Sequence, residues 1–266
     1  MRIGFIGGGA MGEAMVRAIL KAGEAQPGQL VVSDVSEARR QHLSSAYGVS
    51  ATEDNNVAVD GAKLVVLAVK PQEFSNVASG LQGKLLDGQT VLSIMAGMPI
   101  ARIARELDHG EIVRAMPNTA AFVGEAMSVW TASAGVSEQG RSAAARVLGS
   151  MGRELQVHDE KYLYMATAVS GSGPGYVFLF IEAFIDAAVA IGFRPETAEE
   201  LMVQTLLGSA LLARETGKPA AELRAMVTSA GGTTAAGLQV LEDAGLRAAA
   251  VAAVRAAYKR AKELGG

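Results

Sequence analysis

The chain has 266 residues, half of them hydrophobic, which suits one large domain or two ordinary ones with a sizeable core. A net charge of −3 with no basic block gives no reason to expect a nucleic-acid partner, and the lack of cysteine excludes disulfides and cysteine–metal sites. The N-terminus lacks a signal-peptide layout, and the longest apolar stretch, Tyr176 to Phe193, contains Glu182 and Asp186. We therefore expect a cytoplasmic protein without a membrane span.

The first half of the chain alternates short apolar strands with helical stretches. This order predicts an α/β fold with a parallel, doubly wound sheet. The expected strands are Arg2–Ile6, Leu30–Ser33, Leu64–Ala68, Thr90–Ile94, Ile112–Arg114, Ala126–Thr131 and Glu154–Val157. The expected helices are Glu13–Ala22, Ser36–Ala46, Gln72–Gly80, Ile100–Glu106 and Ser137–Ser150.

A glycine motif, G-x-G-x-x-G, lies directly after the first strand and before the first helix. In it the first glycine permits a tight turn, the second lets a pyrophosphate approach the backbone, and the third lets the helix pack close to the strand. The helix N-terminus then faces the phosphates. The motif therefore predicts a dinucleotide site, with a purely structural glycine turn as the alternative. Its residues are Gly7, Gly9, Ala10, Met11 and Gly12.

The end of the second strand carries conflicting signals about the cofactor. Asp34 follows the last motif glycine by roughly 20 residues, where an acidic side chain can bond the adenosine ribose of NAD. Ser33 and Ser36 offer hydroxyls, and Arg39 and Arg40 offer guanidinium groups suited to the 2′-phosphate of NADP. The alternative for the two arginines is a solvated helix face.

Loops after the next three strands should line the cofactor crevice, because ligands of open sheets bind outside the carboxyl ends of the strands. Lys70 either contacts the cofactor or is merely exposed. Ala96 and Gly97 leave room for a flat ring, and Asn118 is either a polar contact near the nicotinamide or an ordinary turn residue. The residues expected in these loops are Ala68, Val69, Lys70, Pro71, Ala96, Gly97 and Asn118.

The pattern changes after residue 158, where no convincing strand remains. We expect a dinucleotide-binding domain at 1–158 and an all-helical domain at 159–266. The helices have more apolar surface than so small a domain can bury, which predicts dimerisation, with packing on the chain's own first domain as the alternative. The expected helices are Tyr176–Ile191, Pro195–Thr216, Ala220–Val227, Thr233–Glu242 and Leu246–Leu264.

Two segments rich in small residues stand out in the second half. Ser170–Tyr176 is predicted to be a tight turn with close backbone approach. Ser229–Thr234 precedes a helix, and its consecutive backbone N–H groups can form a nest for a small carboxylate near Thr234. The alternative is a helix N-cap made by Ser229 or Thr233.

Other polar residues receive no firm chemical role. Glu182 and Asp186 share a helix face, where we expect them to bond neighbouring helices or an interface; a general acid/base pair is the alternative. The three histidines lack metal-ligand spacing, so no metal site is expected.

Taken together, these motifs resemble the pyrroline-5-carboxylate reductase family over essentially the whole chain. Ala120 and Ala230 stand where the family usually has proline, which puts substrate affinity in question more than the reaction. The matching runs, in the family's order, are the glycine motif, Ala68–Pro71, Met116–Thr119, Ser170–Tyr176, Ser229–Thr234, Ala236–Leu238, Leu241–Glu242 and Arg260–Leu264.

The resemblance implies an oxidoreductase of proline biosynthesis that reduces the C=N bond of 1-pyrroline-5-carboxylate to L-proline with NAD(P)H. NADP(H) is the family's usual preference, and Asp34 keeps NAD(H) open. A homodimer, in some members within a larger ring of dimers, is also implied. The active site would combine a nicotinamide with substrate-loop residues that can come from the partner chain. Thr234 would lie near the ring nitrogen, and the substrate-binding residues carried over are Ser229, Gly231, Gly232, Thr233 and Thr234.

Three other interpretations remain. β-Hydroxyacid dehydrogenases share the start of the chain but need a catalytic lysine in the helical domain, and here no lysine follows Ser170–Tyr176 until Lys218. A reductase of another cyclic imine would differ only in pocket contacts. A non-catalytic NADP-binding sensor would have no need of the Ser229–Thr234 loop.

Overall fold

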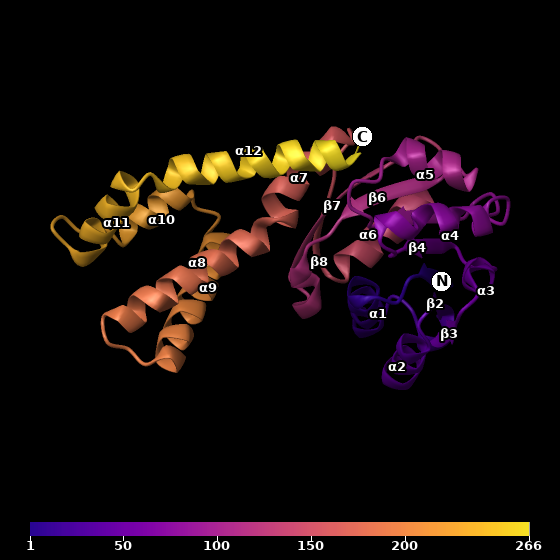
Figure 1. Ribbon diagram of the computed structural model, residues 1–266, viewed down its shortest axis with the longest axis horizontal. Helices are drawn as coiled ribbons and strands as arrows, with labels where there is room; N and C mark the ends of the chain where they lie inside the picture. The colour runs from indigo at the N-terminus through magenta and orange to yellow at the C-terminus, as the bar shows by residue number, and fades with distance from the viewer. Residues whose placement is uncertain (266) are drawn as a thin grey trace. The chain divides into compact units, whose positions relative to one another are not determined.

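The structure, a computed structural model that describes residues 1–265, contains an eight-stranded sheet with helices and a further set of long helices (Figure 1). The strands are β1 (Ile3–Ile6), β2 (Leu30–Ser33), β3 (Ser50–Thr52), β4 (Leu64–Leu67), β5 (Thr90–Ser93), β6 (Ile112–Met116), β7 (Ala126–Ala132) and β8 (Gly152–Gln156). The helices up to the end of the sheet region are α1 (Ala10–Ala22), η1 (Pro27–Gln29), α2 (Glu37–Tyr47), α3 (Asn55–Val59), η2 (Pro71–Glu73), α4 (Phe74–Leu81), α5 (Ile100–Leu107), η3 (Thr119–Val123), α6 (Glu138–Gly149), α7 (Lys161–Ala166) and the π-helical turn η4 (Thr167–Gly171). The remaining helices are α8 (Gly173–Ala190), α9 (Pro195–Thr216), α10 (Ala220–Met226), α11 (Thr233–Asp243) and α12 (Leu246–Gly265).

The strand order in the sheet is β3-β2-β1-β4-β5-β6-β7-β8. The chain winds outward from β1 in one direction and from β4 in the other, so the order reverses between these two strands. Ile6, at the end of β1, is in register with Ser33 of β2 and with Leu67 of β4. The carboxyl ends of the three strands therefore meet at the switch point where open sheets bind ligands.

Both faces of the sheet are buried, which explains why its strands are apolar runs rather than alternating ones. In β4, Leu64 and Val66 belong to one buried cluster and Val65 and Leu67 to the other. Helices α1 and α6 contribute to the first cluster, and α3, α4 and α5 to the second. The predicted doubly wound α/β fold is confirmed.

Five local features differ from the predicted elements. The short strand β3 and helix α3 were not expected, and α7 was missed as well. Strand β7 pairs antiparallel with β6, whereas the other neighbouring strands pair in parallel. The predicted tight turn at Ser170–Tyr176 is wrong, because the segment is helical: η4 ends at Gly171, Ser172 is right-handed helical, and α8 begins at Gly173.

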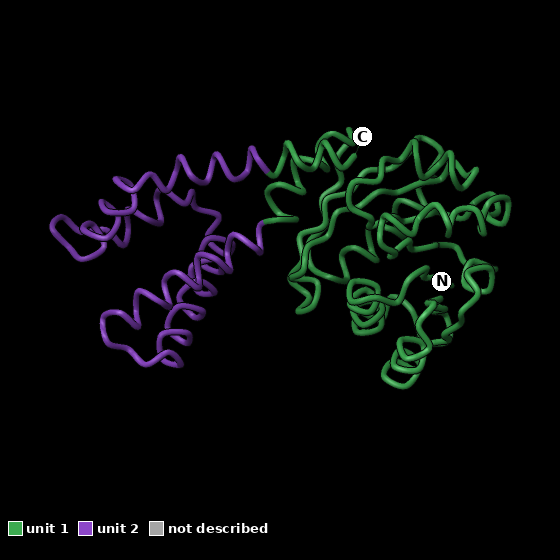
Figure 2. The backbone as a smooth tube through the Cα atoms, in the orientation of Figure 1, with its two compact units in different colours: residues 1–172, 257–266 green, residues 173–256 purple. Residues whose placement is uncertain are grey.

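Two compact units divide the chain, and they are coloured separately in Figure 2. Unit 1 comprises Met1–Ser172 and the chain's last residues from Ala257, and unit 2 comprises Gly173–Ala256. This division differs from the expected boundary at residue 158. Helix α7 groups with the sheet because Arg114 of β6, almost fully buried, donates to Glu160 at 2.5 Å and lies 5.0 Å from the centre of the Tyr164 ring.

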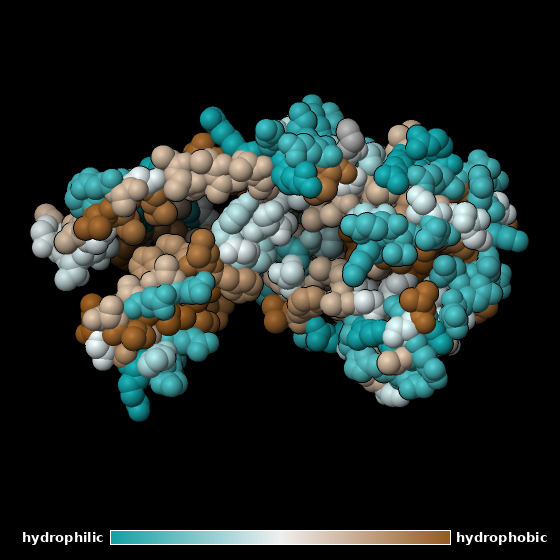
Figure 3. Space-filling view, in the orientation of Figure 1, coloured by the Kyte–Doolittle hydropathy of each residue, from teal (hydrophilic) through white to brown (hydrophobic). Residues whose placement is uncertain are grey.

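Unit 2 has no hydrophobic core of its own. Among its described residues, Ala198 is the only one that is buried. Large apolar side chains of α8, including Phe178 and Leu179, are about two-thirds exposed, and brown apolar surface covers much of the helices α8 and α9 in Figure 3. So much exposed apolar surface marks an interaction face.

One helical run has the length and composition of a membrane span. Lys161–Ala190 contains an 18-residue window of mean hydropathy 1.5, none of which is buried within the chain. One such helix is weak evidence for a membrane span, because the core helix of a soluble protein and a signal sequence pass the same test. Glu182 and Asp186 interrupt the run, and both are exposed in the isolated chain.

Candidate active site

Two adjoining clefts lie where the carboxyl ends of β1, β2, β4, β5 and β6 meet, and Val69 lines both. The larger cleft, of about 450 Å³, extends along the loops after β4, β5 and β6. The smaller cleft, of about 410 Å³, lies between the ends of β1 and β2 and the start of α4. An extended two-part cleft at the switch point of an open sheet suits a dinucleotide.

The glycine motif has the geometry that a dinucleotide requires. Gly7 has φ +100°, and a Cβ on Gly12 would lie 2.5 Å from the Gly7 carbonyl oxygen, so α1 packs closely against β1. Around Gly9 the space is open, with no described atom within 4 Å of an added Cβ. Gly9 is also the N-cap of α1 and supplies no side-chain cap. The first N–H groups of α1 are therefore available to a pyrophosphate.

Most of the predicted cofactor residues gather around the larger cleft. Its wall also includes Ile94, Met95, Met116, Pro117, Thr119 and Gly171, which sequence analysis did not assign to the site. Gly171 was missed because the π-helical turn that places it was not foreseen; such turns are frequent at functional sites. The predicted residues in the wall are Gly9, Ala10, Met11, Ala68, Val69, Lys70, Pro71, Ala96 and Asn118.

Three of the predicted cofactor residues differ in their surroundings. Lys70 is exposed in the cleft wall. Asn118 bonds the protein itself, because its Nδ2 donates to the Ser170 carbonyl at 3.1 Å and its Oδ1 accepts from the Met127 N–H at 3.4 Å. Gly97 does not line the cleft: it has φ +71°, and an added Cβ would lie 2.8 Å from the Leu264 carbonyl oxygen at the end of α12.

The smaller cleft is built around Asp34. Its Oδ2 accepts the Gly8 N–H at 2.8 Å and its Oδ1 accepts the Ser36 N–H at 2.9 Å. Ser33 also lines this cleft, but its hydroxyl is fully buried and lies 2.6 Å from Asn55 Oδ1. Asp34 thus joins the glycine motif to the β2–α2 turn.

Other residues of the smaller cleft were missed. They come from the start of α3 and from η2 and α4, namely Asn55, Glu73, Asn76 and Val77. The rule that strand ends carry ligand residues would have found Asn55, had the three-residue strand β3 been recognised.

Arg39 and Arg40 both engage other groups of the protein. Arg39 donates from Nε to the Gly8 carbonyl at 2.9 Å, and one of its terminal nitrogens reaches Glu13 at 2.6 Å. Arg40 donates to the Asp34 carbonyl at 2.8 Å and lies 3.5 Å from Glu53. Neither arginine is among the residues that line the smaller cleft.

Glu13, in the first turn of α1, is the centre of a polar cluster beside the glycine motif. Arg39, His42 and Tyr47 all contact its carboxylate, at 2.6, 2.7 and 2.9 Å. Burial alone would raise the pKa of Glu13, but these three hydrogen bonds outweigh it and lower the pKa from 4.5 to about 2. Burial and the bond to Glu13 raise the pKa of Tyr47.

The predicted substrate loop lies in unit 2. Gly231 has φ +67°, the Gly232 N–H bonds the Ser229 carbonyl at 3.0 Å, and Gly232 is the N-cap of α11 without a side-chain cap. Neither Ser229 nor Thr233 therefore caps the helix. Both side chains and that of Thr234 are exposed, beside the free N–H groups of the first turn of α11.

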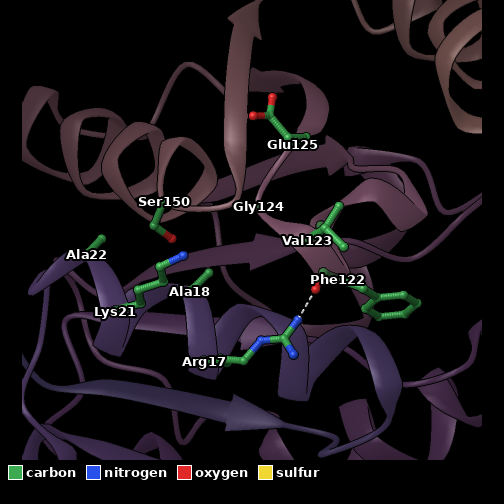
Figure 4. A pocket seen from close by; sticks show the side chains of 10 residues that line it. Arg17, Ala18, Lys21, Ala22, Phe122, Val123, Gly124, Glu125 and Ser150 are labelled. Carbon is green, nitrogen blue, oxygen red and sulfur yellow. Dashed lines mark hydrogen bonds between the residues drawn. The ribbon is translucent and has the colours of Figure 1, made fainter. Parts of the chain in front are cut away.

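A further pocket, of about 590 Å³, shares no residue with the two clefts (Figure 4). Arg17 and Lys21 of α1 line it together with the segment from Ala121 to Glu125, and Arg17 donates to the Phe122 carbonyl. Because it lies outside the switch point, we do not assign the chemistry to it. Among the described residues, no group of three or more histidines or carboxylates could hold a metal ion.

Comparisons with known proteins agree with this geometry. A family profile described as pyrroline-5-carboxylate reductase dimerisation matches residues 160–264, and one described as NADP oxidoreductase coenzyme F420-dependent matches residues 2–97. The chain is 39% identical to a pyrroline-5-carboxylate reductase of Synechocystis sp., covering 100% of this chain and 98% of the relative.

Solved structures of pyrroline-5-carboxylate reductases are also similar to this chain. A pyrroline-5-carboxylate reductase from Coxiella burnetii superposes with a TM-score of 0.94 at 36% identity, covering 100% of this chain and 98% of the other. The Plasmodium falciparum pyrroline carboxylate reductase, solved with NADP bound, has a TM-score of 0.89 at 29% identity, with coverage of 100% and 98%.

Proposed function

This chain belongs to the pyrroline-5-carboxylate reductase family, and from that premise we propose how its own residues carry out the reaction. The enzyme reduces the C=N bond of 1-pyrroline-5-carboxylate to L-proline by hydride transfer from NAD(P)H. The observation that carries this conclusion is similarity to reductases along the whole chain.

The cofactor residues divide into three groups, one for each part of the dinucleotide. The N–H groups at the start of α1 bind the pyrophosphate, and Gly9 leaves it room. Around the larger cleft, the loop Ala68–Pro71 together with Ala96 and Asn118 surrounds the nicotinamide, which supplies the hydride when bound. The adenosine lies in the smaller cleft beside Asp34.

The substrate residues are those of the Ser229–Thr234 loop. The Ser229 hydroxyl and the N–H groups of Thr233 and Thr234 bind the substrate carboxylate, because a glycine turn at a helix N-terminus is an anion site. Gly231 and Gly232 shape that turn, and the Gly232 N–H closes it by bonding the Ser229 carbonyl. An iminium carbon is already electrophilic, so hydride transfer needs mainly positioning. The Thr234 hydroxyl lies near the ring nitrogen and moves or holds its proton, so no histidine or cysteine is required.

The Thr234 hydroxyl can be tested directly. Thr234→Ala lowers kcat/KM by about 10- to 1000-fold, the range for loss of a positioning or proton-transfer group. Thr228→Ala is the matched control, since Thr228 follows the end of α10 and its hydroxyl bonds the Arg224 carbonyl of that helix at 2.6 Å. Wild-type kinetics in Thr234→Ala, under conditions where both variants are folded, would overturn this assignment.

Three finer features of the function are also proposals. Unit 2 forms a homodimer, which the dimerisation profile and the exposed apolar helices support, and a larger ring of dimers is an extension of it. The location is cytoplasmic. Family resemblance favours NADP(H) and leaves NAD(H) open. The contacts of Asp34 in the smaller cleft help to decide between the two cofactors.

A further inference from the structure

The smaller cleft has an acidic lining at its ribose end. Its described wall contains two carboxylates, Asp34 and Glu73, and no lysine, arginine or histidine. The 2′-phosphate that distinguishes NADP from NAD carries between one and two negative charges near neutral pH. A phosphate placed in this cleft would meet like charge without a cation in the wall to offset it.

Asp34 is well placed to accept a ribose hydroxyl. The Gly8 and Ser36 N–H groups hold its two oxygens in a fixed position, at 2.8 and 2.9 Å. An ionised carboxylate has about four acceptor positions, so each oxygen can still accept a further hydrogen bond. A free 2′-hydroxyl can donate to it, whereas a 2′-phosphate cannot.

The groups that would favour a phosphate already have hydrogen-bond partners within the protein. The Ser33 hydroxyl is buried against Asn55 and the Phe5 carbonyl. Arg39 is held by Glu13 and by the Gly8 carbonyl. Arg40 bonds the carbonyls of Asp34 and Val35.

The Glu13–Arg39 pair is the contact most relevant to selectivity. The Arg39 guanidinium bonds the Gly8 carbonyl, and the N–H of the same Gly8 bonds the Asp34 carboxylate, so Gly8 links the two side chains. Glu13 draws that guanidinium toward α1 and supplies the charge that neutralises it. His42 and Tyr47 hold the Glu13 carboxylate in this position.

We propose that this chain binds NAD(H) in preference to NADP(H), with Asp34 as the selecting acceptor and Glu13 as the residue that withholds Arg39 from a 2′-phosphate. The proposal rests on the proposed function for the identity of the cofactor site. It reverses the preference that family resemblance favours.

The direct test compares ADP-ribose with 2′-phospho-ADP-ribose, because these fragments differ only at the selected position. Titration calorimetry on the full-length protein should give a Kd for ADP-ribose at least about tenfold below that for the 2′-phosphate. Equal binding of the two fragments, or tighter binding of the phosphorylated one, would overturn the proposal. NADH and NADPH titrated in the same way should follow the same order.

Substitutions then test the two named residues. Asp34→Asn keeps an acceptor oxygen for one N–H group but removes the charge. It should lower the Kd for 2′-phospho-ADP-ribose relative to the Kd for ADP-ribose by about tenfold or more. Glu13→Gln should shift this ratio of Kd values in the same direction by about threefold, because Arg39 is released. An unchanged ratio in Asp34→Asn would contradict its role as selector.

The matched control is Glu24→Gln, which removes a carboxylate that pairs with Arg146 beyond the C-terminal end of α1. It should leave the Kd ratio unchanged, and a shift as large as that of Glu13→Gln would overturn the specific role of Glu13. Failure of the proposed function gives a different result: neither NADH nor NADPH would be oxidised with 1-pyrroline-5-carboxylate, while the fragment titrations would still decide the selectivity.

Discussion

At the scale of single residues, two glycines of the same motif serve different purposes. A methyl group on Gly12 would overlap the Gly7 carbonyl, whereas one on Gly9 would meet nothing within 4 Å. Gly12→Ala should therefore lower the free energy of unfolding by about 1–3 kcal/mol, the usual cost of overpacking. Gly9→Ala should leave stability within about 0.5 kcal/mol of wild type.

Gly9 matters for cofactor binding although it does not matter for stability. Its open side faces the space where a pyrophosphate approaches, so Gly9→Ala should weaken NADH binding by about tenfold or more despite normal stability. Urea unfolding and fluorescence titration of the two variants give both quantities. A destabilised Gly9→Ala with unchanged affinity would show that Gly9 serves only the turn.

The lowered pKa of Glu13 implies that the stability of the protein depends on pH. Its pKa is lowered to about 2 in the folded protein from 4.5, so its contribution is fully present above pH 4.5 and is lost as the pH falls toward 2. Glu13→Gln should lower the free energy of unfolding by about 2 kcal/mol at pH 6 and by clearly less at pH 3. The comparison is urea unfolding of both proteins at the two pH values, and an equal difference at each would contradict it.

At the scale of elements, the Arg114–Glu160 pair fixes α7 to the sheet. Glu160→Ala leaves the buried Arg114 guanidinium without its carboxylate and should cost about 2–4 kcal/mol. Glu138→Ala is the control, because Glu138 is 92% exposed in its pair with Arg141, and should cost less than about 0.5 kcal/mol. Thermal unfolding separates the two cases, and equal shifts would show that Arg114 does not depend on Glu160.

The sequence predicted the sheet because each buried strand is an unbroken apolar run. The switch-point rule then indicated the predicted cofactor residues, most of which line the two clefts. Three-residue β3 is too short for such a signal, and Asn55 was lost with it. The direction of β7 was not predicted, since it depends on the connection between β6 and β7, which contains the helical turn η3. Small residues in Ser170–Tyr176 suggested a turn, but the segment is helical despite their weak helix propensity.

The hydrogen-bond and packing partners of individual residues could not be predicted from the sequence. Arg39 was predicted to bind the cofactor from its charge and position, yet its contacts with Glu13 and Gly8 join residues 26 and 31 positions away. Gly97 was expected to face a ring, but it meets Leu264 from the far end of the chain. Only the folded structure brings such pairs together.

At the scale of the whole molecule, a helical unit without a core needs a partner. The dimer proposal predicts a sedimentation mass of at least twice 27.4 kDa at micromolar concentration. Phe178→Glu, on the exposed face of α8, should reduce that mass, whereas Leu86→Glu in unit 1 should not, although both side chains are almost equally exposed. A wild-type protein that sediments as a monomer would contradict the proposal.

The central claim is tested most directly by following the absorbance of NADH and of NADPH in the presence of 1-pyrroline-5-carboxylate, with the six-membered cyclic imine as a ring-size control. We predict rapid oxidation that depends on the five-membered substrate. Absence of oxidation with either cofactor, or equal rates with the six-membered imine, would contradict the assigned reaction.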